Sequence, residues 1–313
     1  MKRVMVTGGA GFIGSHVVDR LLAGGDEVIV YDNFSTGSMW NLRQHAGSDR
    51  LFVAQGNVLD LPPLRENMEG CQAVFHFQAN ADVRGGVADT RRDLEQNTIA
   101  TWNALEAARL AGVGTFVFAS SAVVYGEPGV FPTPETATLR QTSLYGASKL
   151  ACEAMAEAYS EYFGIRVLIF RFVSWVGPRY SHGVVADFVA KLRRDPHMLE
   201  ILGDGAQEKS YLHVADGVDG IFLAYGADTG RKAVFNLGHD AHVNVVEVAS
   251  AVAEEMGLQG VMFKMAGGRR GWPGDSPLVH LDTTRMRMLG WSPRIPILEG
   301  IRDTARFLLR GRM

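Results

Sequence analysis

Two residues of the motif Tyr145-Gly-Ala-Ser-Lys149 could carry out proton chemistry together. They stand four positions apart, so in a helix both side chains lie on the same face. A lysine ammonium close to a phenol favours the phenolate and lowers the pKa of the tyrosine. Such a tyrosine can serve as a general base near neutral pH. On spacing alone, a half-buried tyrosine beside a surface lysine is the simpler interpretation, so other motifs must decide.

A glycine-rich segment near the N-terminus could hold a dinucleotide. Gly8, Gly11 and Gly14 follow an apolar run and open a helical pattern, where they allow a tight turn and close approach to a pyrophosphate. The N-terminus of the helix offers free N–H groups to that anion. Asp32 follows the next apolar run, where its carboxylate can accept hydrogen bonds from ribose hydroxyls and repel a 2′-phosphate. Tight packing would explain the glycines alone, whereas the glycines with Asp32 predict NAD rather than NADP.

Strands and helices alternate through the first half of the chain. The predicted strands cover residues 4–7, 27–31, 51–54, 73–77, 115–119 and 165–172, and the clearest helices cover 12–22, 97–111 and 145–163. Alternation of this kind indicates βαβ units and a parallel sheet. The run Val167-Leu-Ile-Phe170 does not alternate in polarity, as expected for a sheet buried on both faces. The fold class is therefore α/β, with a Rossmann-type doubly wound parallel sheet.

The pattern loosens after Arg171, where glycine and proline become frequent. We predict an NAD-binding Rossmann domain over residues 1–172 with a return segment near 212–238. Residues 173–211 and 239–313 then form a smaller C-terminal substrate-binding lobe. Such a lobe supplies substrate contacts, because ligands bind outside the carboxyl ends of parallel strands.

Composition narrows the class of protein. The chain has 313 residues, 47% of them hydrophobic, and a formal net charge of −3, which does not favour nucleic-acid binding. Cys71 and Cys152 lie outside any CxxC motif, so we expect two small buried side chains, with neither a disulfide scaffold nor a thiolate metal site. No apolar run approaches the roughly 20 residues of a membrane helix. The chain starts directly with a strand pattern, so we expect no signal peptide and a soluble cytoplasmic protein.

The chain also resembles the extended short-chain dehydrogenase/reductase family, and within it the NAD-dependent nucleotide-sugar epimerases and dehydratases, especially those like UDP-glucose 4-epimerase. The resemblance covers nearly all 313 residues. It is carried, in order, by TGGAGFIG at 7–14, Tyr31-Asp-Asn33, Gly56-Asn-Val58, FASSAVVYG at 118–126, YGASK at 145–149, Gly203-Asp-Gly205, Tyr211-Leu-His-Val-Ala-Asp216, Arg270-Gly-Trp-Pro-Gly-Asp275 and Leu289-Gly-Trp-Ser-Pro293.

The resemblance implies a role for each matching residue. Tyr145 is the base, Lys149 tunes it and holds the nicotinamide ribose, and Ser121 bonds the sugar hydroxyl being oxidised. The implied cofactor-binding residues are Gly8, Gly11, Phe12, Ile13, Gly14, Asp32, Asn33, Asn57, Val58, Phe77, Gln78, Ala79, Asn97, Tyr145 and Lys149. Two places depart from the family pattern: Asn57 replaces the usual aspartate, and Phe77-Gln-Ala79 replaces Leu-Ala-Ala.

The residues after Ser121 favour one reaction within the family. Dehydratases and sugar-acid decarboxylases carry acidic residues at the next one or two positions, whereas this chain has Ala122 and Val123, which cannot move protons. The expected reaction is 4-epimerisation of a nucleotide-diphosphate sugar through a transient 4-keto intermediate. The alternatives are a nucleotide-sugar dehydratase or UDP-glucuronate decarboxylase, and, in a different class, a non-catalytic NAD-binding regulator.

The resemblance also implies contacts with the nucleotide. Lys209 and Arg270 are expected to face the diphosphate, with lysine standing where the family has arginine. Glu200 and Leu202 match the strand that packs on the uracil. Lys209 and Arg270 could also be solvated surface charges. UDP is the expected nucleotide, and dTDP stays open.

Contacts with the sugar are the least determined. Ser174 and Ala122 line the expected pocket, and Ser174 replaces an asparagine of the family. Arg84 and Arg179 are candidates for a uronate carboxylate. Val279 would wall the pocket and admit a 2-acetamido group, although it also fits as an ordinary strand residue. Hexose, N-acetylhexosamine and hexuronate nucleotides all stay open.

Extended members of this family commonly pair through two long helices. The corresponding segments here are residues 97–111 and 145–163. Their outer positions would form a two-fold interface, so we expect a homodimer.

Overall fold

The computed structural model describes residues 1–311, which divide into two compact units. Unit 1 contains residues 1–124, 143–171 and 221–235, and unit 2 contains 125–142, 172–220 and the chain from 236 onward. Residues 125–142, which we placed in the first domain, belong to unit 2. The Thr133 N–H donates to the His280 carbonyl and the Thr133 carbonyl accepts from the Asp282 N–H, at 2.8 and 2.9 Å. The segment is thus bonded to residues that follow it by about 150 positions in sequence.

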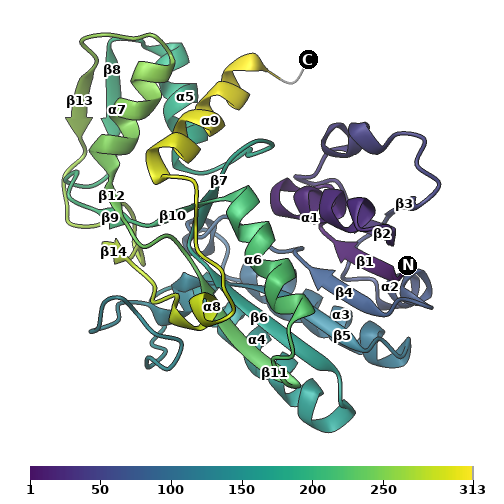
Figure 1. Ribbon diagram of the computed structural model, residues 1–313. Coiled ribbons are helices and arrows are strands. Elements are labelled where there is room, and N and C mark those ends of the chain that lie inside the picture. The colour runs from purple at the N-terminus through teal and green to yellow at the C-terminus, as the bar shows by residue number, and fades with distance from the viewer. Residues whose placement is uncertain (312–313) are drawn as a thin grey trace. The chain divides into compact units, whose positions relative to one another are not determined.

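Unit 1 is built on a seven-stranded sheet with the order β11-β6-β5-β4-β1-β2-β3 (Figure 1). The strands are β1 (Arg3–Thr7), β2 (Glu27–Asp32), β3 (Leu51–Gln55), β4 (Ala73–His76), β5 (Thr115–Ser121), β6 (Arg166–Phe172) and β11 (Lys232–Leu237). The sheet is parallel, and β1 lies between β2 and β4. The predicted strands and the Rossmann-type fold are therefore confirmed.

Alternate residues of each strand bury opposite faces of this sheet. On β4, Val74 belongs to a fully buried cluster that includes side chains of α2 (Leu61–Met68), α3 (Ala100–Leu110) and α4 (Leu144–Phe163). Its neighbour Phe75 stacks instead on Phe222 of α6 (Val214–Gly226), with ring centroids 5.6 Å apart. Burial on both faces explains why the strands read as continuous apolar runs. Cys71 and Cys152 are buried free thiols, as predicted.

The predicted catalytic turn lies at the start of α4, and the helical segment that ends in α3 lies beside it. Ser143 caps α4 by accepting a hydrogen bond from the Gly146 N–H at 3.1 Å, and Gly164 ends the helix with a left-handed φ of 72°. The predicted helix over 97–111 is largely confirmed by α3 (Ala100–Leu110), but its first residues belong to a π-helical turn, η3 (Leu94–Ile99), that continues into α3. Single π-turns are often found at functional sites.

Unit 2 combines three small sheets with four more helices among residues 1–311. Its strands are β7 (Ser174–Val176), β8 (Met198–Ile201), β9 (Glu208–Lys209), β10 (Tyr211–His213), β12 (Val243–Asn244), β13 (Met262–Met265) and β14 (Leu278–Val279). The helices are α5 (Val184–Arg194), α7 (Val245–Glu255), α8 (Thr284–Met288) and α9 (Ile297–Arg310), and α5, α7 and α9 pack on one another. Among residues 1–311, no helix combines the length and apolarity that crossing a bilayer requires. The cytoplasmic location stays a prediction.

Candidate active site

The glycine-rich turn of unit 1 leaves no room for side chains where a dinucleotide would lie. Gly8 has a left-handed φ of 69°, and a Cβ there would stand 2.8 Å from the backbone nitrogen of Gln78. A Cβ on Gly14 would stand 2.2 Å from the Gly8 carbonyl oxygen. Gly11 precedes α1 (Phe12–Ala23), whose first turn also contains Phe12 and Ile13. Only glycine allows these backbones to pack so closely.

Asp32 ends β2 beside this turn and is 6% exposed. Its two carboxylate oxygens accept hydrogen bonds from the backbone N–H groups of Ala10 and Phe34, at 3.0 and 2.8 Å. The carboxylate therefore fixes the turn as well as offering its remaining lone pairs to a ribose. The next residue, Asn33, is exposed and accepts from the Ser35 N–H at 3.0 Å.

The other predicted cofactor contacts follow β3 and β4 at the same end of the parallel strands. Asn57 accepts from the Leu59 N–H at 3.0 Å, and Val58 is buried. Gln78 donates to the Gln96 carbonyl of η3 at 3.2 Å, while its buried Oε1 finds no partner among residues 1–311. Phe77 and Ala79 flank it and are half-buried. A tight glycine cradle, an acid at the ribose position and an unsatisfied buried acceptor together fit a bound NAD.

Tyr145 and Lys149 lie in the first turns of α4, as their spacing predicted. Lys149 is 3% exposed, and its Nζ donates to the Ala119 carbonyl of β5 at 2.9 Å. The same Nζ lies 6.0 Å from the centroid of the Tyr145 ring. Ser121, at the end of β5, is hydrogen-bonded to Tyr145. Ala122 follows it and begins the 3-10 turn η4 (Ala122–Tyr125). The three predicted catalytic residues are therefore brought together.

The expected lowering of the Tyr145 pKa is wrong. Burial raises the pKa of Tyr145 to about 12, the bond with Ser121 works against that rise, and the negative charge of Asp93 adds to it. Burial also lowers the pKa of Lys149 to about 8, although Cys152, Glu153 and Asp93 oppose that change. Desolvation is the largest cause of both shifts, because each group is charged in only one of its protonation states and the protein interior disfavours that state.

Asn97 lies at the centre of a polar network in η3 and is 1% exposed. Its Oδ1 accepts from the Asn80 N–H at 2.8 Å, and its Nδ2 donates to Ser148 Oγ at 2.9 Å. Ser148 belongs to the same helical turn as Tyr145 and Lys149. Asn97 therefore joins the loop after β4 to the catalytic turn, and its predicted contact with NAD stays a prediction.

Sequence reasoning missed a buried ion pair that lies one helical turn beyond Lys149. Glu153 and Arg171 are both buried, and their closest atoms are 2.7 Å apart. Ser120, next to the predicted catalytic serine, donates to the same carboxylate. His76 is also buried between Thr7 and Thr101, and burial lowers its pKa to about 3. The sequence offered two signals for the ion pair: Glu153 stands one helical turn after Lys149, and Arg171 is a charged residue within an apolar strand.

In unit 2, Lys209 is held by an acid and an aromatic ring. Its Nζ lies 2.6 Å from Asp275 Oδ1 and 4.5 Å from the centroid of the Trp272 ring. Asp275 is buried, and its other oxygen accepts from the Gly271 N–H at 3.1 Å. Within the motif Arg270–Asp275, Asp275 thus bonds both Gly271 and Lys209. Asp275 and the Trp272 ring therefore hold the Lys209 ammonium in a defined position.

The remaining predicted substrate residues occupy varied environments. Arg270 is exposed and ion-paired with Glu127. Glu200 lies on β8 with an exposed side chain, and Leu202 follows that strand, where its carbonyl accepts from Gln207 at 3.2 Å. Val279 lies on β14 as the register partner of Lys209, which confirms the strand interpretation.

The last three residues are Ser174, Arg84 and Arg179. Ser174 starts β7 and is exposed. Arg84 belongs to unit 1, has a 57% exposed side chain and lies 3.8 Å from Asp82. Arg179 belongs to unit 2 and has a left-handed φ of 68°, unusual for a residue with a side chain. Their predicted roles are not tested by these environments.

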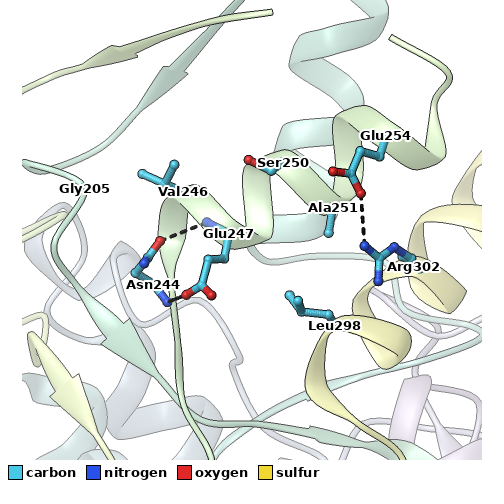
Figure 2. Close-up of a pocket in the computed structure, with 9 residues that line it drawn as sticks. All are labelled: Gly205, Asn244, Val246, Glu247, Ser250, Ala251, Glu254, Leu298 and Arg302. Atoms are coloured by element: carbon cyan, nitrogen blue, oxygen red, sulfur yellow. Dashed lines mark hydrogen bonds and ion pairs between the residues drawn. The ribbon is translucent and has the colours of Figure 1, made fainter. Parts of the chain in front are cut away.

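A separate cavity of about 470 Å³ lies in unit 2 between α7 and the start of α9 (Figure 2). The capping pair Asn244 and Glu247 and the ion pair of Glu254 with Arg302, 3.0 Å apart, lie around it. None of the predicted site residues is among those that line it, which are Gly205, Asn244, Val246, Glu247, Ser250, Ala251, Glu254, Leu298 and Arg302. We do not assign this cavity to the active site.

Comparison with known proteins places the chain in a family. Residues 4–238 match the model of the NAD dependent epimerase/dehydratase family, so the chain belongs to that family. It is 34% identical to the UDP-glucose 4-epimerase of Mycolicibacterium smegmatis, covering 97% of this chain and 98% of the relative.

Solved structures agree with that assignment. A crystal structure of a UDP-galactose 4-epimerase is 38% identical, with a TM-score of 0.89 and coverage of 98% and 99% of the two chains. The dTDP-glucose 4,6-dehydratase of Streptomyces venezuelae, solved with NAD bound, is 30% identical, with a TM-score of 0.91 and coverage of 99% and 98%. The predicted family and the predicted cofactor, NAD, are confirmed.

Proposed function

We propose that this chain catalyses the 4-epimerisation of a UDP-sugar. The observation that carries the proposal is the grouping of Ser121, Tyr145 and Lys149 beside a cradle that fits NAD, with no acid following Ser121. The two carboxylates that act on Tyr145 or Lys149 are those of Asp93 and Glu153. Both are buried, and Glu153 is neutralised by Arg171. Glu153 is therefore not available to move the extra protons that elimination of a hydroxyl requires, and Asp93 is held by Asn80 and Asn97.

In this proposal each residue has one task. Ser121 bonds the sugar 4-hydroxyl, and Tyr145 removes its proton. Lys149, fixed on the Ala119 carbonyl, holds a positive charge near the phenol. NAD, when bound, supplies a hydride acceptor and a positively charged ring. The sugar is held as a 4-keto species and turns over, and Tyr145 returns the proton after reduction on the opposite face. A cation near Tyr145 favours the phenolate, which offsets the effect of burial on its pKa.

In unit 2 we assign Lys209 and Arg270 to the diphosphate and the backbone around Glu200 and Leu202 to the base. The pairing of Lys209 with Asp275 and Trp272 supports a preformed cation site. The sugar class stays a choice among hexose, N-acetylhexosamine and hexuronate. Val279, beside Lys209 on one small sheet, supports a pocket that admits a 2-acetamido group.

We also propose a homodimer formed through α3 and α4. Large apolar side chains stay exposed on these helices or at their ends: Ile99, Trp102, Leu110, Tyr162 and Phe163 are 40% to 81% exposed. Apolar groups of this size on two neighbouring helices of one chain are typical of an interface.

The deciding experiment is incubation of the purified protein with a panel of UDP- and dTDP-sugars, followed by NMR and mass spectrometry. An epimerase gives a second sugar signal at unchanged mass. Loss of water or of carbon dioxide would instead identify the dehydratase or the decarboxylase. NAD binding without conversion of any sugar would favour the non-catalytic regulator.

A further inference from the structure

Asp93 is a buried carboxylate that nothing in the proposed reaction uses. It precedes η3 and is 1% exposed. Its Oδ1 accepts from Asn80 Nδ2 at 2.8 Å and from Asn97 Nδ2 at 3.2 Å. Its Oδ2 is fully covered and finds no hydrogen-bond partner in the described chain, residues 1–311. A buried carboxylate oxygen left without a donor costs free energy, so its retention requires a reason.

A continuous path of hydrogen bonds runs from Asp93 to the catalytic turn. Asn97 Nδ2, which donates to Asp93, also donates to Ser148 Oγ at 2.9 Å. Ser148 Oγ in turn donates to the Tyr145 carbonyl at 2.7 Å. The Asp93 carboxylate is the strongest acceptor in this path and orients the Asn97 amide. That amide donates to Ser148 Oγ, whose own proton is then directed to the Tyr145 carbonyl. Asp93 therefore fixes the direction of the whole path.

The backbone also makes room for the unpaired oxygen. Gly86, in the turn η2 (Gly85–Val87), is buried, and a Cβ there would lie 2.9 Å from Asp93 Oδ2. A larger residue at this position would therefore have to displace the carboxylate.

We propose that Asp93 is a positioning residue for the reaction: through Asn97 and Ser148 it aligns the first turn of α4, which contains Tyr145. The negative charge of Asp93 also opposes ionisation of the Tyr145 hydroxyl. Only the expected effect on kcat rests on the proposed function, whereas the expected effect on the Tyr145 titration does not. The chemical consequence is that the Tyr145 hydroxyl keeps its proton until a positively charged group lies beside it. The residue would then become a base only when the cofactor is bound.

Other charged and titratable groups around Tyr145 and Asp93 come from α4, β6 and β4. Lys149 and Cys152 come from α4 itself, and Glu153, one turn further, is paired with Arg171. His76 lies on β4, and burial keeps it neutral at physiological pH. Within residues 1–311, Asp93 is the carboxylate that acts on Tyr145, and its charge raises the pKa of Tyr145. Removal of that charge should therefore lower this pKa.

The test compares Asp93→Asn with the matched control Asp89→Asn, which removes one charge from the same loop at an exposed ion pair with Arg92. First, ultraviolet titration measures tyrosinate in the NAD-bound protein, and subtraction of the same titration for each variant combined with Tyr145→Phe isolates Tyr145. Second, kcat is measured against pH. In Asp93→Asn, both the Tyr145 titration and the acid limb of kcat should move to lower pH by at least about half a unit. Asp89→Asn should move neither.

Ser148→Ala separates the positioning effect of Asp93 from the effect of its charge, because it breaks the hydrogen-bond path to Tyr145 and leaves the Asp93 carboxylate in place. It should lower kcat severalfold without moving the acid limb. If Asp93→Asn does not fold, Asp93→Ser takes its place. An unchanged Tyr145 titration in the Asp93 variant would overturn the proposal, whether or not the protein turns over a sugar. Absence of turnover in the unsubstituted protein, with the titration shifted as expected, would instead contradict the epimerase assignment alone.

Discussion

Val279 and Lys209 are register partners on the parallel strands β14 and β9 of unit 2. Directly opposed residues of neighbouring strands project to the same face of a sheet, whereas the adjacent Leu278 and Glu208 project to the other face. Val279 therefore shares a face with the cation that we assign to the substrate diphosphate. The proposed pocket wall at Val279 would thus lie beside the proposed diphosphate contact at Lys209.

Replacement of Val279 by tyrosine should discriminate between sugars. If Val279 walls the pocket, Val279→Tyr should reduce kcat/KM for N-acetylated substrates by roughly 5- to 150-fold more than for unmodified hexoses, since steric overpacking costs about 1–3 kcal/mol. Leu278→Tyr, on the opposite face of the same strand, is the control and should affect both substrates alike. Equal losses in Val279→Tyr would mean that Val279 does not limit the pocket.

Tyr145→Phe should fold normally and still hold NAD, because the hydroxyl is the only group removed. Loss of a general base lowers turnover by about a hundredfold or more. Circular dichroism and the absorbance of bound cofactor provide the controls, and the conversion rate of the best sugar is the measurement. Turnover near the original level would remove Tyr145 from the mechanism.

Asp32 should make NAD the dinucleotide that stays with the purified protein. Its carboxylate would meet the 2′-phosphate of NADP. Asp32→Ser should narrow the difference in Kd between NAD and NADP, and it should also weaken both, because the turn loses the bonds to Ala10 and Phe34. Identification of NADP in an extract of the original protein would refute this assignment.

Burial of Lys149 should make stability depend on pH in a defined window. Its pKa falls to about 8 from an ordinary value of 10.5, so the unfolded chain binds more protons between these values. The stability contributed by this residue therefore increases as pH rises from about 8 to 10.5. The free energy of unfolding of Lys149→Met, relative to the original protein, should fall over the same range. Urea unfolding at pH 7.5 and pH 10 measures this difference, and a constant difference would contradict the shifted pKa.

The proposed dimer can be tested at one exposed side chain. Trp102→Glu places a charge among the apolar residues on α3 and α4 and should shift the protein to a monomer at micromolar concentration. Light scattering provides the measurement. Met288→Glu, on the 82% exposed methionine at the end of α8, is the control and should leave the mass unchanged. A monomeric original protein would remove the basis for the dimer.

The sequence determined the features that depend on local pattern. The glycine turn, the acid at residue 32, the order of strands and helices and the α4 turn with Tyr145 and Lys149 all rest on residues close in sequence. Their geometry follows from backbone sterics and from the periodicity of apolar residues, which are visible in one chain.

Only the tertiary structure decided the environment of each functional group. Lys209 meets Asp275 across 66 residues, and Asp93 reaches the catalytic turn through Asn97 and Ser148, which are 51 residues apart. The spacing of Tyr145 and Lys149 suggested a lowered tyrosine pKa, yet burial raised it. Desolvation and long-range pairing depend on which distant segments cover a side chain. The spacing of residues along the chain does not predict which segments those are.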